Sequence, residues 1–197
     1  MSSLFYKLKN EVDILLTREK IKLRQNGDPV LRKVAREVPL EYINTQDFKD
    51  LITKMILIMR SNKGQGIAAP QVGVDLQVIA IEFTEHDLEM ATKQYGKNEV
   101  EKRQMRTFPL HIFINPKLKI INYETTCFEE GCLSILGTVG VVQRYREVQL
   151  EFVNEKGVNV LMNFDGWLAR MVQHEMHHLK GFLIVDFFIK KKKLFFR

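Results

Sequence analysis

Apolar residues recur at helical spacing in three segments of the chain. The clearest, "TQDFKDLITKMILIMR" (residues 45–60), offers Thr45 as an N-cap and carries a stripe typical of a packed helix: Phe48, Leu51, Ile52, Met55 and Met59. Near the N-terminus, "LFYKLKNEVDILL" places on one helical face Leu4, Leu8, Val12 and Leu15. The third segment, "DGWLARMVQHEMHHLKGF" (165–182), closes at Gly181, a residue type common just after a helix.

Four segments between the predicted helices at 45–60 and 165–182 are rich in β-branched residues and partly alternate between apolar and polar positions, which predicts strands. They are "LQVIAIEF", "HIFINPKLKIIN", "VGVVQRYREVQLEFVN" and "GVNVLMNF". The stretch "GQGIAAPQVG" (64–73) cannot form a simple helix, because glycines and a proline interrupt it. Grouped strands between helices indicate an α+β fold. We expect antiparallel β-sheets packed around the C-terminal helix, with another helix near the N-terminus.

The chain of 197 residues fits a single domain, and nothing in it reads as a linker or repeat. We expect residues 1–24 to be a helical extension, 84–108 an exposed polar insertion, and 188–197 a basic tail. No apolar run approaches membrane-spanning length, and charges interrupt the apolar residues at the start, unlike a secretory signal. We therefore expect a cytoplasmic protein. A monomer is the default expectation for its oligomeric state, and we expect no DNA or membrane partner.

The formal net charge of +6 comes partly from "KKKK", Lys190 to Lys193. Such a run is usually a solvated tail, and the alternative is contact with an anionic partner such as RNA or a lipid surface. The two cysteines, Cys127 and Cys132, are too few for a disulfide framework. We interpret them as free thiols, one of which is a candidate metal ligand.

The C-terminal helix contains H-E-x-x-H, formed by His174, Glu175 and His178. Residues four apart lie on one helical face, so the two imidazoles can bind one metal ion while the glutamate acts as general base. His177 is an alternative partner for His174, and a helix with surface histidines is the plain alternative to a metal site. A downstream third ligand is poorly supported, because residue 184 is isoleucine and Asp186 lies close to the helix end. Cys132, in "EEGCLSILG", is the upstream candidate.

Three segments in order, "GQGIAAPQVG", "EGCLS" and "QHEMHHLKG", resemble the motifs of peptide deformylases, which remove the formyl group from the initiator methionine of new chains. Further similarity lies in "GDPVLRKVAREV", "FINPKL" and "VVQR", so the resemblance covers roughly residues 25–187. It implies N-formylmethionyl nascent peptides as substrates. It also implies one divalent metal ion, physiologically Fe²⁺, with Zn²⁺, Ni²⁺ or Co²⁺ also suited to imidazole and thiolate ligands.

By this resemblance the metal ligands are Cys132, His174 and His178, and Glu175 transfers the proton. The oxyanion donors are the side-chain amide of Gln71 and the backbone N–H of Leu133, while the backbone of Gly66 lies against the substrate. The implied walls of the methionine pocket are Ile67, Phe128 and Met171. Without the resemblance, Gln71 reads as a turn residue and the three wall residues as ordinary core.

Two positions depart from the family pattern: His177 stands where an aspartate is usual, and Leu136 where proline is preferred. Arg144 is the natural partner for such an aspartate, and a neutral His177 that accepts a hydrogen bond from Arg144 can replace it. Two alternatives remain open. One is a metallohydrolase of another acylated amine, and the other is a degenerate relative that binds ribosomes through its basic tail.

Overall fold

The computed structural model of the chain describes residues 6, 9, 11–12 and 21–193, and of residues 190–193 only the backbone. Most of the predicted N-terminal helix face, at Leu4, Leu8 and Leu15, lies outside the described residues. The fourth position of that face, Val12, is helical and buried.

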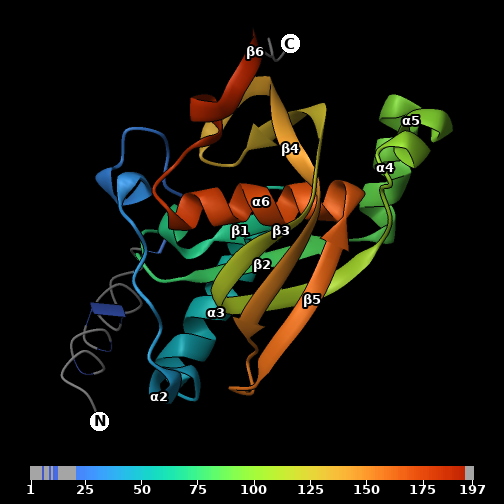
Figure 1. Ribbon diagram of the computed structural model, residues 1–197. Coiled ribbons are helices and arrows are strands. Elements are labelled where there is room, and N and C mark those ends of the chain that lie inside the picture. The colour runs from blue at the N-terminus through green and yellow to red at the C-terminus, as the bar shows by residue number, and fades with distance from the viewer. Residues whose placement is uncertain (1–5, 7–8, 10, 13–20, 194–197) are drawn as a thin grey trace.

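The fold is α+β, as predicted, with one antiparallel sheet in place of several (Figure 1). The strand order is β1-β2-β3-β4-β5, with β6 paired to β4. The strands are β1 (Gly66–Ala68), β2 (Val78–Phe83), β3 (Phe108–Cys132), β4 (Ile135–Val153), β5 (Asn159–Asp165) and β6 (Phe188–Lys193). The helices are α2 (Leu40–Ile43), α3 (Gln46–Ser61), α4 (Glu85–Tyr95), α5 (Lys97–Lys102) and α6 (Gly166–Leu179). Short 3-10 turns are η1 (Pro29–Arg32), η2 (Ala69–Val72) and η3 (Ile184–Phe187).

Strand β2 is buried on both faces of the sheet, because it contributes to one core with α3 and to another with α6. Successive side chains of a strand point to opposite faces. Val78 and Ala80 of β2 therefore join the core with α3, whereas Ile79 and Ile81 join the core with α6. The unbroken apolar run of this strand follows from burial on both sides, since neither face needs polar residues.

The start of α3 and the end of α6 lie where the sequence indicates. The hydroxyl of Thr45 accepts a hydrogen bond from the N–H of Phe48 at 3.2 Å, which caps α3. Gly181 follows α6 with φ of 75°, a left-handed conformation that favours glycine. A Cβ there would also lie 2.7 Å from the carbonyl oxygen of Arg32, so the helix stops where the chain crosses η1.

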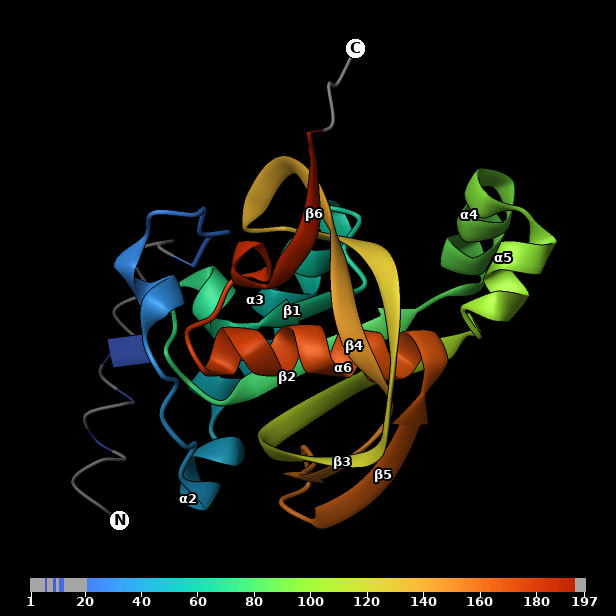
Figure 2. The same cartoon turned by 45° about the horizontal axis from the view of Figure 1, so that its top comes forward.

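The expected polar insertion is helical rather than a plain loop, and α4 and α5 stand out from the body of the molecule (Figure 2). Thr84 caps α4, and its hydroxyl accepts from the N–H of Asp87 at 3.1 Å. Most side chains of the two helices are exposed or half-buried. Ala91, Val100 and Met105 are buried and attach the pair to the core beside α6.

The segment expected as a basic tail continues the sheet, because the backbone of Phe188–Lys193 forms β6. It pairs with β4 from Val142 opposite Phe188 to Thr138 opposite Lys193. Within the part of the chain that the structure describes, no helix combines the length and apolar character needed to cross a bilayer.

Phe113 of β3 provides a test of the core between the sheet and α6. Its ring is fully buried and meets the ring of Phe152 edge-on, with centroids 4.6 Å apart. We expect Phe113→Ala to lower the free energy of unfolding by about 4 kcal/mol, since it removes a large buried side chain and leaves a cavity. Urea denaturation measures this loss. Leu161→Ala, at a side chain 60% exposed, is the control and should change it by less than about 1 kcal/mol.

Candidate metal centre

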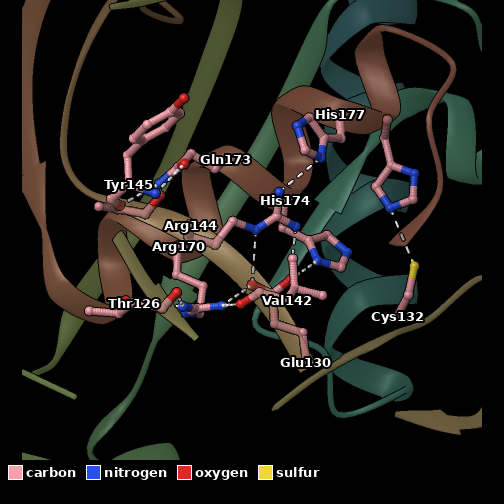
Figure 3. Close-up of polar contacts among 12 residues, drawn as sticks. Thr126, Glu130, Cys132, Val142, Arg144, Tyr145, Arg170, Gln173, His174 and His177 are labelled. Atoms are coloured by element: carbon pink, nitrogen blue, oxygen red, sulfur yellow. Dashed lines mark hydrogen bonds and ion pairs between the residues drawn. The ribbon is translucent and has the colours of Figure 1, made fainter. Parts of the chain in front are cut away.

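Helix α6 and the end of β3 bring together the three predicted ligands. His174 and His178 are four residues apart on α6, and their ring centroids lie 5.2 Å apart. Cys132, the last residue of β3, places its Sγ 3.3 Å from Nε2 of His178 (Figure 3). The candidate ligand atoms of Cys132, His174 and His178 all lie within 4.8 Å of one another.

The buried carboxylate of Glu130 orients the imidazole of His174 through its Nδ1 atom. Oε2 of Glu130 lies 2.9 Å from Nδ1 of His174, which leaves Nε2 of that ring for a metal ion (Figure 3). Arg144 donates to both oxygens of Glu130, at 3.0 and 2.9 Å, and Arg170 donates at 2.7 Å. Burial opposes ionisation of this carboxyl, but the hydrogen bonds from His174 and Arg144 hold its pKa well below the usual value.

The two candidate imidazole ligands differ in their electrostatic surroundings. Burial disfavours protonation of His174, yet hydrogen bonds with Cys132 and Glu130 raise its pKa to about 10. These neighbours stabilise positive charge at the ring, and a divalent cation supplies such charge as a proton does. Burial and then the charge of His174 hold the pKa of His178 well below its usual value, so this ring is neutral as a metal ligand must be.

His177, the alternative partner for His174, lies outside the group of candidate ligand atoms. Arg144 donates from Nη1 to Nδ1 of His177 at 2.8 Å, and the imidazole stacks on Phe187 with centroids 3.9 Å apart. Burial, and then the charge of Arg144, lower the pKa of His177 to about 3, so the ring is neutral near pH 7. The predicted neutral acceptor for Arg144 is therefore present.

Glu175 of α6 lies against the backbone of Gly66. Its side chain is buried, and burial raises its pKa to about 7. A Cβ added to Gly66 would lie 3.0 Å from Cδ of Glu175 and closer still to Oε1. The glycine thus leaves the space that the carboxylate occupies, a role that the sequence did not indicate.

The amide of Gln71 is fixed with its NH₂ group toward Cys132. Its Oε1 accepts from the N–H of Ala68 at 2.8 Å, and its Nε2 lies 3.2 Å from Oγ of Ser134 and 3.7 Å from Sγ of Cys132. Leu133 follows Cys132 in the turn between β3 and β4. Two hydrogen-bond donors are therefore near Cys132: the Gln71 amide faces its sulfur, and the N–H of Leu133 belongs to the next residue in the chain.

The three expected pocket residues have different surroundings. Ile67 is fully buried in the core with α3, and Met171 is buried in the core with α6. Phe128 is half-buried, with the guanidinium carbons of Arg103 and Arg170 at 4.6 and 5.1 Å from its ring centroid. Arg103 follows α5, so the insertion reaches this ring. A role for these residues as pocket walls remains a prediction.

Sequence reasoning overlooked Glu130 and Arg170, although both stand in quoted motifs. The available signal for Glu130 was strand alternation, because a residue two positions before Cys132 shares its side of the strand. Arg170 lies four residues before His174 on one helical face, and it also donates to the carbonyl oxygen of Val142 at 2.9 Å. Buried arginine is uncommon, and the helical spacing of α6 alone does not predict that Arg170 is buried.

The donor set fits a transition-metal ion. One sulfur and two imidazole nitrogens converge, one imidazole is oriented by a carboxylate, and the other is neutral. Three protein ligands and one open position are typical of catalytic metal sites, and a glutamate beside such ligands is typical of metal-dependent hydrolases. Fold and site together thus define a candidate metallohydrolase.

A family model described as polypeptide deformylase matches residues 20–194. The chain belongs to the polypeptide deformylase family. It is 39% identical over 160 residues to peptide deformylase 1A, chloroplastic, of Solanum lycopersicum, covering 81% of this chain and 56% of the relative. It is 36% identical over 162 residues to the mitochondrial peptide deformylase of Homo sapiens, covering 82% and 65%. The chain thus spans less than two-thirds of these two relatives. For the peptide deformylase of Orientia tsutsugamushi (strain Ikeda), identity is 34% and coverage 84% and 85%.

Solved structures of peptide deformylases have the same fold. The enzyme of Acinetobacter baumannii with bound Met-Ala-Ser aligns with a TM-score of 0.73 at 28% identity, covering 84% of this chain and 96% of that one. The Synechococcus elongatus enzyme in complex with actinonin aligns with a TM-score of 0.69 at 36% identity, covering 85% and 80%.

The ligand assignment predicts a clear contrast between neighbouring histidines. His178→Ala, and likewise His174→Ala or Cys132→Ser, should lose stoichiometric metal binding, because each removes one of three donors. His177→Ala should retain the metal, since its imidazole contacts Arg144 and Phe187 instead. Elemental analysis of the purified, dialysed proteins measures this contrast. Full occupancy in His178→Ala would contradict the assignment.

Proposed function

We propose that the protein is a metal-dependent peptide deformylase, which hydrolyses the N-formyl group of formylmethionyl peptides and releases formate. The observation that carries this proposal is the convergence of Cys132, His174 and His178, with the Gln71 amide 3.7 Å from the cysteine sulfur and Glu175 next to His174 on α6. The Met-Ala-Ser bound to the Acinetobacter baumannii relative supports a peptide that begins with methionine.

Cys132, His174 and His178 would hold the metal ion. When bound, the ion supplies a Lewis acid, which polarises a carbonyl group and lowers the pKa of water. Glu130 keeps His174 in the orientation for this task through the contact at Nδ1. Arg144 and Arg170 in turn keep Glu130 ionised and fixed.

Glu175 moves the proton. Its carboxylate takes a proton from the attacking water and delivers it to the leaving amine, so a pKa raised by burial to about 7 suits both steps. The space beside Gly66 holds this carboxylate close to the β1 backbone. The substrate backbone would lie along the same strand edge.

Gln71 and Leu133 stabilise the negative charge that develops on the formyl oxygen. Donors placed in advance at that position contribute more than donors that must reorient, because they cost no rearrangement during the reaction. The Gln71 amide meets this condition, since Ala68 fixes its oxygen and thereby directs its NH₂ group.

Several finer expectations belong to the same proposal. Fe²⁺ would be the physiological ion, with zinc, nickel or cobalt able to replace it, because the ligand set suits all four. The pocket for the methionine side chain would be bordered by Phe128, Met171 and Ile67. The protein would work as a cytoplasmic monomer, and the lysines of residues 190–193 would contact the ribosome electrostatically.

The activity is tested by formate release from formyl-Met-Ala-Ser with metal-loaded protein. Glu175→Ala should keep the metal and the fold but lose about 1000-fold in kcat, since both proton transfers pass through this carboxylate. Glu155→Ala, in the exposed turn between β4 and β5, is the matched control and should behave as wild type. An inactive wild-type protein at full metal content would refute the activity, and an active Glu175→Ala would refute the assigned base.

Gly66→Ala tests the space beside the general base. The added methyl group would displace the Glu175 carboxylate, so we expect kcat to fall about a hundredfold, as small misplacements of a catalytic group do. Metal content and melting temperature should stay close to wild type, because Gly66 does not have a positive φ. A variant with unchanged kcat would show that β1 or α6 shifts to restore the geometry.

A further inference from the structure

The residues before η1 form a strap (residues 24–26), which contacts both residues proposed as oxyanion donors, Gln71 and Leu133, and also Ser134, the next residue of the turn. The N–H of Arg24 donates to the carbonyl oxygen of Gln71 at 2.7 Å. Nε2 of Gln25 donates to the carbonyl oxygen of Leu133 at 3.1 Å. The N–H of Asn26 donates to the carbonyl oxygen of Ser134 at 2.8 Å.

We propose that Gln25 is a positioning residue, which fixes the Leu133 peptide so that its N–H faces the developing oxyanion. The inference rests on the proposed function, in which Leu133 is an oxyanion donor. The side chain of Gln25 donates to the Leu133 carbonyl oxygen, so it acts through Leu133.

The turn that carries Leu133 needs an external partner. Leu133 and Ser134 connect Cys132 of β3 to Ile135 of β4, which pair directly, and the register shifts just before Cys132. Two-residue hairpin turns favour conformations with positive φ at the first central residue. Among the described residues other than glycine, positive φ occurs at Lys63, Gln104 and Asn115, so this turn is of a less favoured type.

Gln25 supplies that partner through its hydrogen bond to the Leu133 carbonyl oxygen. The N–H of Leu133 belongs to the peptide before its Cα and the carbonyl to the peptide after it. A hydrogen bond that fixes the carbonyl therefore restricts the backbone rotation that relates these two peptide planes. Ser134 is held as well, because its Oγ lies 3.2 Å from Nε2 of Gln71. The two proposed donors and the strap thus form one hydrogen-bonded unit.

The strap is itself anchored at both ends. At its start, the Arg24 side chain lies against Gly73, where a Cβ would stand 2.7 Å from the guanidinium. After it, the N–H of Asp28 donates to the carbonyl oxygen of Gln25 at 3.0 Å, and Oδ1 of Asp28 accepts from the N–H of Val30 at 3.1 Å. Leu31 is fully buried, so the strap begins and ends on fixed structure.

Gln25 is the position in the strap where the side chain decides the contact. Arg24 and Asn26 reach Gln71 and Ser134 through backbone N–H groups, which nearly every residue type provides. The bond to Leu133 requires a side-chain donor of suitable length. Gln25→Met keeps that length and removes the donor, while Gln25→Glu keeps the shape and places an oxygen against the Leu133 carbonyl.

The first experiment compares kinetics of the metal-loaded full chain with formyl-Met-Ala-Ser. Removal of an oxyanion donor typically costs about a hundredfold or more, and a misdirected donor should cost less, so we expect Gln25→Met and Gln25→Glu to lower kcat about tenfold. KM should change less than about twofold, because the substrate contacts in the ground state remain. Lys22→Met, at an exposed side chain three positions earlier, is the matched control and should keep wild-type kcat.

The second experiment is independent of activity. Hydrogen exchange at the amides of Arg24 and Asn26, which donate to the carbonyl oxygens of Gln71 and Ser134, should accelerate at least about tenfold in Gln25→Met because the strap and the turn are no longer held together. It should stay unchanged in Lys22→Met, while amides of α3 keep their rates. Unchanged exchange, or a Gln25→Met protein with wild-type kcat at full metal content, would overturn the proposal. Wild-type protein that releases no formate would instead refute the proposed function, and exchange would still decide whether Gln25 holds the turn.

Discussion

The site is organised by the hydrogen bonds and ion pairs that the buried carboxylate of Glu130 makes with two arginines and a histidine. This carboxylate accepts hydrogen bonds from Arg144 of β4 and Arg170 of α6, and it contacts Nδ1 of His174. A charge in the protein interior is stable only when it is paired and hydrogen-bonded, and removing one partner leaves the others uncompensated. The carboxylate therefore fixes β3, β4 and α6 relative to one another, and the position of Cys132 relative to the two histidines follows from that arrangement.

His177 shows how this network tolerates a change of residue type. Arg144 uses its Nε and Nη2 atoms for Glu130 and its Nη1 atom for Nδ1 of His177. A neutral imidazole accepts this hydrogen bond but brings no negative charge, so Glu130 alone compensates Arg144 and Arg170 among the groups of this network. The stacked ring of Phe187 supports the imidazole from η3. The ligand set is unaffected, because His177 points away from Cys132 and toward the sheet.

Much of the architecture was predictable because it depends on local periodicity. Helix α3 with its Thr45 cap, helix α6 closed by Gly181, and strands β2, β4 and β5 lie where apolar spacing places them. The pair His174 and His178 follows from the same rule, since residues four apart share a helical face. Helices α4 and α5 were missed because their polar sequence buries few side chains, and β6 because four lysines suggested a solvated tail.

The candidate residues for the chemistry were indicated by the sequence. The spacing of H-E-x-x-H indicates two candidate ligands and a candidate base, and the resemblance to peptide deformylases adds Cys132 and Gln71 as candidates. The surroundings of these candidates depend on how the elements pack: the Glu130 network, the space that Gly66 leaves for Glu175, and the hydrogen bond from Gln25 to Leu133. Gln25 and Leu133 are 108 positions apart in the chain. A hydrogen bond over such a separation leaves no periodic trace in the sequence, because it depends on how complete elements pack and not on the spacing within any one of them.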